Sequence, residues 1–346
     1  AAFTGPASFL PRAAGRNAMS PLALHMDAAL IVQNKGGGHG EIGFHLAKQL
    51  RGKGLDVTLL QDATTKFDTP PFRQYGELDN AGVEVVAVDF SSPDAIANAV
   101  QNKAYTHVFD NFAKNVDTVS TVATLAKSWG VKNFAYVSSG GMYESKNAQP
   151  MTEDGPTKAT GQRGVEEYLA SQGLPWTSFR PQYIYGPATN KRDYLDWFFD
   201  RIVRDRPCPL PGDGQQLASV SRAEDVASML ASVVGREQIA AGKVYNCGTN
   251  KFYSYQQICE MVAQTTGKQL AIKTYNPKDF ELPKGAFPFR NDAFFVSPYK
   301  AQMELGWAPT CDLAQDMAWY YQSYQDAGKM TKAMAFEADD IILSRP

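Results

Sequence analysis

Short apolar runs alternate with longer amphipathic stretches through the first half of the chain. The runs have the length of buried strands, and the longer stretches repeat their apolar residues at helical spacing. This alternation predicts an α/β fold in which a parallel, doubly wound sheet is built with right-handed crossovers. Predicted strands are residues 56–61, 83–88, 107–110 and 133–138, and predicted helices are 93–101 and 116–129.

A glycine cluster separates the first apolar run, residues 28–32, from a helix-like stretch that ends at Arg51. Gly37, Gly40 and Gly43 have G-x-x-G-x-x-G spacing, which allows a tight turn, close approach to a pyrophosphate and entry into a helix. A second predicted strand follows that helix, as a dinucleotide-binding unit requires. We therefore predict a Rossmann-like sheet with a smaller C-terminal α/β lobe.

Acidic residues near this turn affect how well it could bind a dinucleotide, in two ways. Glu41 suits the helix dipole but repels a phosphate. The second strand ends at Gln61 with Asp62 one place later, so the expected ribose contact is either missing or displaced. Asp89 follows the third strand and is predicted, with the three glycines, to line a cofactor crevice, which we interpret as a vestigial NAD(P) site.

Composition is that of an ordinary globular protein. The 346 residues are 44% apolar and 20% charged, with a formal net charge of -2, so a nucleic-acid partner would need a local basic patch. No apolar run is long enough for a membrane span. The cysteines lack C-x-x-C spacing and are predicted to be free, buried thiols. They are Cys208, Cys247, Cys259 and Cys311.

The first 26 residues contain Arg12 and Arg16 but no acidic residue, and they are rich in Ala, Ser and Pro. This composition is typical of an organelle transit peptide, and the Ala-Ala-Phe start resembles a plastid-targeting motif. We expect a plastid, stromal location, with a leader of no function as the alternative. The predicted divisions are the leader 1–26, a nucleotide-binding domain 27–180, a smaller lobe with returning segments 181–330, and a tail 331–346.

Further motifs occur in a fixed order along the chain. They are VSSGGMY at 137–143, FRPQYIYGP at 179–187, PGDG at 211–214, SRAEDVA at 221–227 and YNCG at 245–248. With the glycine turn, they resemble the extended, or atypical, short-chain dehydrogenase/reductase superfamily. In that superfamily a Tyr and a Lys four residues later pass a proton while hydride moves to or from nicotinamide.

That catalytic pair is missing. None of the sixteen tyrosines has a lysine four residues later: Tyr143 is followed there by Asn147 and Tyr168 by Gln172. Ser139 matches the superfamily's catalytic serine, but without its general acid it is interpreted as a residual hydrogen-bonding group. A nicotinamide-dependent epimerase or reductase is therefore the disfavoured alternative.

Other details resemble a narrower family, the chloroplast stem-loop-binding proteins. The matching residues are Gly37 to His39, Ile42 and Gly43, FRPQY at 179–183, WFFDRIVRDR at 197–206, FRN at 289–291 and FEADDI at 336–341. The resemblance implies binding of plastid RNA, cleavage of stem-loops with a divalent metal such as Mg²⁺, and association with ribosomal, transcription or other plastid complexes.

Two stretches are candidate RNA-facing surfaces. Arg201, Arg204 and Arg206 follow three aromatic residues, a combination that suits phosphates and unstacked bases, although interleaved aspartates also fit an ordinary amphipathic helix. Residues 251–300 carry seven lysines and arginines against four acidic residues, with Lys273 and Lys278 as the preferred contacts. A solvated lobe surface is the alternative for this stretch.

The sequence names only weak catalytic candidates, Asp110, Ser139 and Glu153, and leaves the metal ligands open among acidic residues that include Asp117. Three hypotheses remain. The chain is an RNA-binding protein and potential endoribonuclease on a reductase-like scaffold, a catalytically silent scaffold subunit of a homo- or hetero-oligomeric plastid complex, or a residual nicotinamide enzyme.

Overall fold

The computed structural model describes residues 26–33, 38–68, 70–144, 148–186, 188 and 194–345, except for the side chains of residues 38 and 39. Residues 1–25 of the predicted leader, and Gly37, lie outside the described residues. None of the helices in the described ranges combines the length and the apolar character needed to cross a bilayer.

A seven-stranded sheet, parallel throughout, forms the centre of the larger domain, with strand order β11-β6-β5-β4-β1-β2-β3. The order reverses between β1 and β4, where a doubly wound sheet opens its ligand crevice. The predicted fold class is thus confirmed. The strands are β1 (Ala28–Val32), β2 (Asp56–Asp62), β3 (Glu84–Val88), β4 (His107–Asp110), β5 (Asn133–Val137), β6 (Trp176–Pro181) and β11 (Lys243–Cys247).

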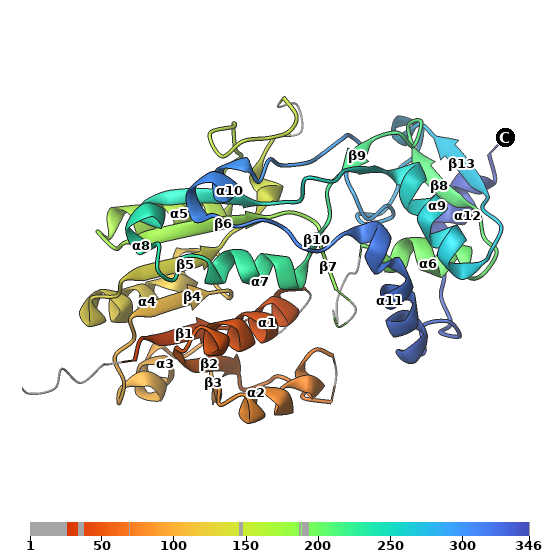
Figure 1. The fold of residues 1–346 in the computed structure, drawn as a ribbon. Coiled ribbons are helices and arrows are strands. Elements are labelled where there is room, and N and C mark those ends of the chain that lie inside the picture. The colour runs from red at the N-terminus through yellow and green to blue at the C-terminus, as the bar shows by residue number, and fades with distance from the viewer. Residues whose placement is uncertain are drawn as a thin grey trace, which may run out of the picture.

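Helices cover both faces of this sheet (Figure 1). One apolar core unites the sheet with α1 (Gly38–Gly52), α2 (Gly76–Asn80), α7 (Ala223–Ala231), α8 (Glu237–Ala240) and α10 (Tyr299–Leu305), together with the short helix η1 (Phe72–Gln74). A second core packs α3 (Pro93–Val100), α4 (Val116–Trp129) and α5 (Gly161–Ser171) on the opposite face.

Local sequence signals explain where these helices begin and end. Asn115 caps α4 by accepting a hydrogen bond from Thr118 N at 3.0 Å, and Gly130 ends the helix at φ 64°, a left-handed conformation that favours glycine. Ser92 caps α3, and Pro93 occupies its first turn. These caps fix the strand-to-helix loops along the crevice.

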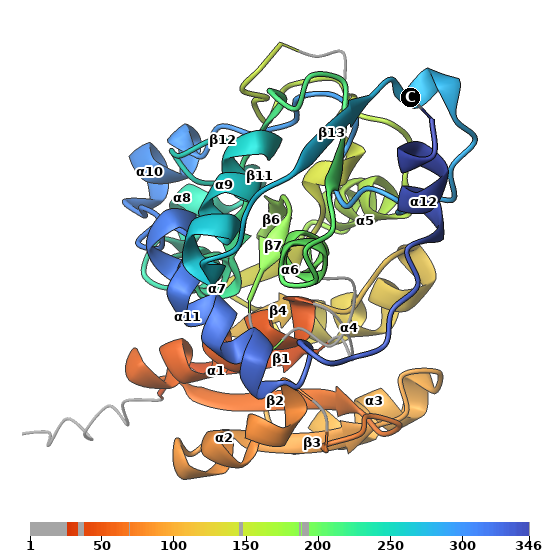
Figure 2. The same ribbon diagram turned by 90° about the vertical axis from the view of Figure 1, so that its right-hand side faces the viewer.

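The smaller lobe adjoins the carboxyl ends of the strands and faces the viewer in Figure 2. Its aromatic-rich core is built mainly from α6 (Asp196–Ile202), α9 (Tyr255–Thr266) and α11 (Leu313–Asp326). Short strand pairs complete it, and α12 (Glu337–Leu343) contacts β8. The strands are β7 (Ile184–Tyr185), β8 (Cys208–Pro211), β9 (Leu217–Ala218), β10 (Ser221–Arg222), β12 (Tyr253–Ser254) and β13 (Ile272–Tyr275).

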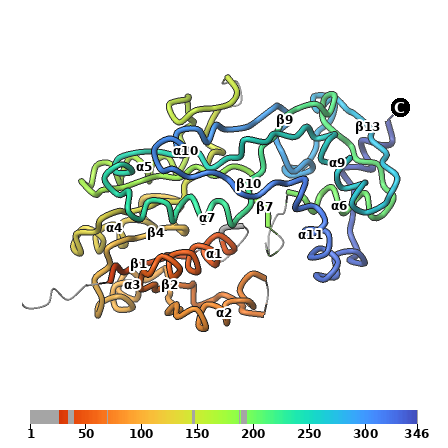
Figure 3. Tube along the Cα trace, viewed as in Figure 1, coloured from red at the N-terminus to blue at the C-terminus, as the bar shows by residue number. Residues whose placement is uncertain are grey.

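The chain passes between the two parts several times, as the tube in Figure 3 shows. After β10 it returns to the large sheet for α7, α8 and β11, and after β13 it returns again for α10. The predicted lobe 181–330 therefore contains long segments that complete the larger domain, and α12 places part of the predicted tail on the lobe.

Candidate functional site

The first turns of α1 are held by the protein's own side chains. Gln33, fully buried after β1, donates to Gly40 O at 2.9 Å and to Tyr75 Oη at 3.0 Å, and it accepts from Asn111 Nδ2 at 2.9 Å. A Cβ on Gly43 would overlap the Gln33 amide, and one on Gly40 would stand 3.0 Å from Pro71 Cγ. Close approach of neighbouring groups therefore requires glycine at position 43.

An acidic residue lies at the end of β2. Gln61 is buried within the strand, and Asp62 is the last residue of β2 and is partly exposed. Asp62 Oδ1 accepts from Thr64 N at 2.8 Å, which fixes the carboxylate at the strand end, where a dinucleotide fold holds its ribose partner. The sequence left open whether the ribose contact is missing or displaced. The structure has the Asp62 carboxylate at the end of β2. These residues fit the adenosine half of a dinucleotide.

Asp89 follows β3 and is tied to the next turn. Its Oδ1 accepts from Ser91 Oγ at 2.7 Å and Ser91 N at 2.9 Å, and these hydrogen bonds hold the pKa of the Asp89 carboxyl below its ordinary value. The nearby Asp62 opposes that effect. Both carboxylates therefore lie near each other at the β2 and β3 ends of the crevice, and cofactor binding by Asp89 stays a prediction.

Glu41 faces inward from the first turn of α1. The side chain is only 4% exposed, its Oε1 lies 3.8 Å from His45 Nε2, and Oε2 has no hydrogen-bond partner among the described residues. A Cβ on Gly186, after β7, would overlap this carboxylate. Glu41 thus places a buried negative charge at the helix entrance, which opposes a pyrophosphate there.

At the end of β4, Asp110 is fully buried. Its Oδ1 accepts from the backbone N of Phe112 and of Ala113, both at 2.8 Å, and Oδ2 has no partner among the described residues. Burial raises the pKa of Asp110 to about 6, although the two backbone hydrogen bonds act against that rise. The main observed role of Asp110 is to fix the loop after β4.

Ser139 and Tyr143 flank the short helix η2 (Gly140–Met142), which follows β5. Ser139 is partly exposed, and its Oγ accepts from Gly141 N at 3.0 Å. Tyr143 is fully buried: its hydroxyl donates to Asn246 Oδ1 at 2.7 Å and accepts from Arg180 Nη1 at 2.8 Å. Burial raises the pKa of Tyr143 to about 12, and its two hydrogen bonds inside the protein give this phenol a structural role.

Glu153 belongs to the buried network behind Tyr143. Its Oε1 accepts from Asn246 N at 2.8 Å, and burial raises the pKa of Glu153. Arg180 completes the network through an ion pair of 2.6 Å with Glu166. Within the described ranges, no group of three or more His, Cys, Asp or Glu is placed to hold a metal ion, so the structure selects no metal ligands among Asp110, Asp117 and Glu153.

The three predicted RNA-binding arginines are engaged within the lobe. Arg201 is 7% exposed, donates to Asp339 Oδ1 at 2.8 Å, and lies 3.6 Å from the centre of the Trp197 ring. Arg204 donates to the backbone O of Lys329 at 2.8 Å, and Arg206 pairs with Asp340. All three guanidinium groups are thus engaged by the C-terminal segment, with Arg201 buried and Arg204 and Arg206 partly exposed, and RNA binding by them stays a prediction.

Beside them is an acidic hollow of about 460 Å³. Its charged lining residues are Asp196, Asp200, Glu337 and Asp339 against Arg201 and Lys284. Burial raises the pKa of Asp339, with Arg201 acting against that rise. An RNA phosphate would meet mostly negative charge in this hollow.

The lysines of residues 251–300 vary in accessibility. Lys273 on β13 donates to Arg345 O at 3.3 Å, and Lys251 pairs with Asp312. Lys278 is exposed on the short helix η3 (Pro277–Asp279), and its ammonium group has no partner among the described residues. RNA binding by Lys273 and Lys278 stays a prediction, for which Lys278 has the freer geometry.

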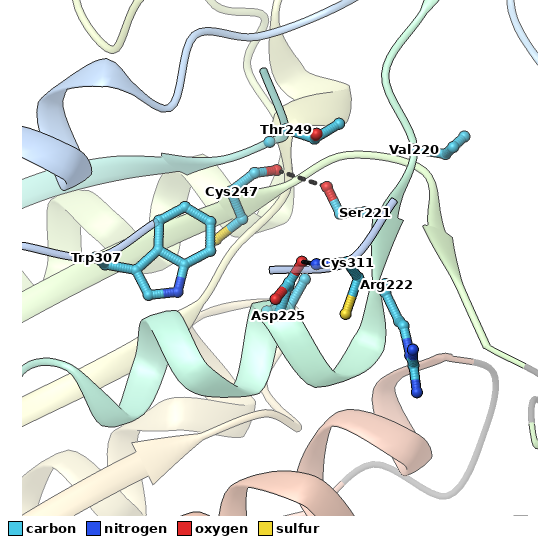
Figure 4. Close-up of a pocket in the computed structure, with 10 residues that line it drawn as sticks. Val220, Ser221, Arg222, Asp225, Cys247, Thr249, Trp307 and Cys311 are labelled. Carbon is cyan, nitrogen blue, oxygen red and sulfur yellow. Dashed lines mark hydrogen bonds between the residues drawn. The ribbon is translucent and has the colours of Figure 1, made fainter. Parts of the chain in front are cut away.

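A small cavity of about 10 Å³ lies where the lobe meets α7 and β11, and Figure 4 shows its lining. Ser221 Oγ donates to Cys247 O at 3.3 Å, and the Asp225 carboxylate accepts from the backbone N of Thr310 and Cys311. A cavity of this volume holds at most a water molecule. The four cysteines are free, as predicted, with three buried and Cys311 partly exposed.

Comparison with known proteins places this site in a family. The model of the NAD dependent epimerase/dehydratase family matches residues 36–248. The chain is 31% identical over 327 residues to "Chloroplast stem-loop binding protein of 41 kDa b, chloroplastic" of Arabidopsis thaliana. The match covers 89% of this chain and 83% of that protein. The chain is also 26% identical to UDP-glucose 4-epimerase of Corynebacterium glutamicum, covering 79% of this chain and 89% of that enzyme.

Solved structures show the same fold. The epimerase Mth375 of Methanothermobacter thermautotrophicus has a TM-score of 0.69 at 17% identity and covers 88% of this chain and 95% of its own. The NAD complex of dTDP-glucose 4,6-dehydratase from Bacillus anthracis has a TM-score of 0.69 at 15% identity. The match covers 87% of this chain and 98% of the dehydratase. The predicted plastid location is confirmed by the chloroplastic relative. The chain belongs to the NAD dependent epimerase/dehydratase family and, within it, groups with the chloroplast stem-loop-binding proteins.

Proposed function

We propose that this chain is a plastid RNA-binding protein built on an epimerase scaffold that no longer carries out hydride chemistry. The observation that carries the proposal is the missing proton-transfer pair, because none of the sixteen tyrosines has a lysine four residues later. Tyr143 does not replace it, since its hydroxyl is fully buried and hydrogen-bonded to Asn246 and Arg180. The stem-loop-binding relative supplies the class of ligand.

The direct test is RNA retention by the purified protein over a series of salt concentrations, with and without magnesium. Binding through phosphates should weaken as salt rises, with a logarithmic slope of roughly -0.7 per contact to single strands. A salt-independent interaction, or none at low salt, would contradict the proposal. A parallel assay with reduced nicotinamide should show no substrate-dependent turnover, and Ser139→Ala should leave that result unchanged.

Cleavage of stem-loops is the finer part of the proposal. A divalent ion would have to be held by fewer than three His, Cys, Asp or Glu side chains of the described residues, with RNA phosphates, water or other protein oxygens completing its coordination. If cleavage occurs, chelation should abolish it while RNA binding persists, because the cations that give affinity are side chains. Loss of binding on chelation would instead show that the metal bridges protein and RNA.

The second candidate is a nucleotide-binding scaffold subunit, favoured by Asp62 at the end of β2. We expect the bound nucleotide to be held by its ribose through Asp62 and by its phosphates near the α1 N-terminus, with Glu41 limiting affinity. Calorimetry with NAD should show weak binding that Asp62→Ala abolishes. Unchanged binding in that variant would place the nucleotide elsewhere.

A further inference from the structure

An open trough of about 560 Å³ lies beside the crevice. We call it the lobe trough; it is lined by Lys158 of the larger domain and by residues between Tyr275 and Asp292 of the lobe. Arg290 joins it to the crevice, because its guanidinium donates to Gly141 O at 2.7 Å, two residues after Ser139. The trough therefore runs from the Ser139 loop outward to β13, which Figure 2 shows at the surface of the lobe.

Two exposed lysines bring positive charge to this trough. Lys158 belongs to its lining, and Lys278 on η3 is the next residue after the lining residue Pro277. Neither ammonium group has a partner among the described residues. Arg290, also in the lining, is oriented by Gly141 and by the ring of Phe294, 3.5 Å from its guanidinium carbon. Asp292 is the only acidic side chain in the lining, so the trough favours an anion.

Phe280 gives the trough lining a flat aromatic surface. Phe280 is partly exposed, the guanidinium of Arg345 lies 4.5 Å from its ring centre, and Tyr275 supports it edge-on at 5.6 Å. Aromatic rings and arginine planes are the groups on which splayed-out RNA bases stack. The exposed amide of Asn291, in the same lining, offers a donor and an acceptor to a base edge.

The size and openness of the trough select the form of the RNA. Its volume lies within the range of about 300 to 1,000 Å³ that takes ligands of drug size, so it fits a short unpaired segment and not a double helix. Paired bases are stacked on each other and cannot reach Phe280. A loop or a single-stranded end can place its bases on the ring and its phosphates near Lys158 and Lys278.

We infer that the lobe trough is the site where unpaired nucleotides of the RNA bind, with bases stacked on Phe280 and phosphates held by Lys158 and Lys278. This rests on the proposed RNA-binding function and gives that function a location. Stem recognition then takes place outside the trough, and the loop is the part that the protein holds most closely.

The test uses the full chain and a labelled hairpin RNA with one 4-thiouridine in its loop. Phe280→Leu, which keeps an apolar side chain but loses the flat ring, should weaken hairpin binding about tenfold, and Phe280→Tyr should restore it. Lys158→Glu should weaken binding about fivefold and reduce the salt slope by roughly 0.7. Lys127→Glu, on α4 far from the lobe (Figure 1), makes the same charge change and should alter affinity less than twofold.

Photocrosslinks from the loop should fall within residues 275–292, and a fully paired RNA of the same sequence should be insensitive to Phe280→Leu. Wild-type binding with unchanged affinity in Phe280→Leu and Lys158→Glu, or crosslinks confined to other segments, would overturn the trough site and leave the proposed function intact. If the wild-type chain retains no RNA at low salt, the trough site and the proposed RNA-binding function are both contradicted. Melting temperatures of the variants show whether a loss of affinity reflects unfolding.

Discussion

Two hollows of the small lobe share the wall formed by Pro283, Gly285 and Ala286 but differ in what surrounds their cations. In the acidic hollow, Arg201 is buried against Asp339, and Arg204, which follows α6, donates to the Lys329 carbonyl of the C-terminal segment. At the lobe trough, Lys158 in the lining and Lys278, next to the lining residue Pro277, are exposed and have no partner among the described residues. A cluster of positive residues in a sequence therefore indicates a nucleic-acid surface only if carboxylates from elsewhere do not reach it.

The largest effect that this comparison predicts is on stability. Arg201→Ala should lower the free energy of unfolding by about 3 to 5 kcal/mol, because it leaves the Asp339 carboxylate buried without a partner. Urea unfolding measures this loss. RNA affinity at a temperature where the variant is folded should stay within twofold. The double variant Arg201→Met with Asp339→Leu should recover part of the stability, and a large loss of RNA binding in Arg201→Ala would reassign this arginine to the RNA surface.

For the lobe trough, Lys278→Glu should weaken RNA binding about tenfold. It should also make the slope of log affinity against log salt concentration shallower by roughly 0.7. The melting temperature should not change, since the ammonium group makes no contact with the described residues. Filter binding at several salt concentrations separates the two quantities. Equal loss for RNAs of different sequence is expected of a phosphate contact, and a sequence-dependent loss would point to base recognition instead.

The acidic hollow should also respond to pH. Burial raises the pKa of Asp200 above its ordinary value of 3.8, and the charge of Asp196 adds to that rise. The folded state then holds this proton more tightly than the unfolded chain does, so the stabilisation is complete below the ordinary pKa and is lost as pH rises through the folded value. The Asn side chain of Asp200→Asn cannot ionise. This variant should be more stable than the wild type only at pH values above the folded-state pKa of Asp200, by about 0.5 to 1 kcal/mol. Thermal melts across pH measure the difference, and a gain at low pH would rule out this cause.

The smallest expected effect comes from Arg206→Glu. Arg206 pairs with the exposed Asp340 and lies 4.5 Å from the ring centre of Phe336, so its loss should cost about 0.2 to 1 kcal/mol of stability. RNA affinity should fall less than twofold, although the charge change equals that of Lys278→Glu. The two reversals are therefore a matched pair. An equal drop in affinity for both would mean that the two hollows act as one surface.

The sheet could be predicted from sequence because its signal is local. The predicted bounds of β4 and α4 agree with the structure, since buried runs and caps lie within each element. The nucleotide turn could also be recognised, but the position of Asp62 depended on where β2 ends, a matter of one residue. The burial and pairing of Arg201 could not be predicted from the neighbouring sequence, because its partner Asp339 lies 138 residues further along the chain. The lobe trough was hidden for the same reason: Lys158 and Phe280 come from different parts of the fold.

Gln33 has a consequence for how the protein folds. Its hydrogen bonds join the start of α1, through Gly40, to Tyr75, 42 residues later, and to Asn111, 78 residues later. During synthesis the start of α1 therefore cannot complete these contacts until β4 has docked beside β1, and contacts of such long range form slowly. A chain that ends before residue 111 would leave the Gln33 amide oxygen without Asn111 as its donor. Pulse-labelling hydrogen exchange should accordingly show the start of α1 gaining protection together with β4, after the local helices have formed.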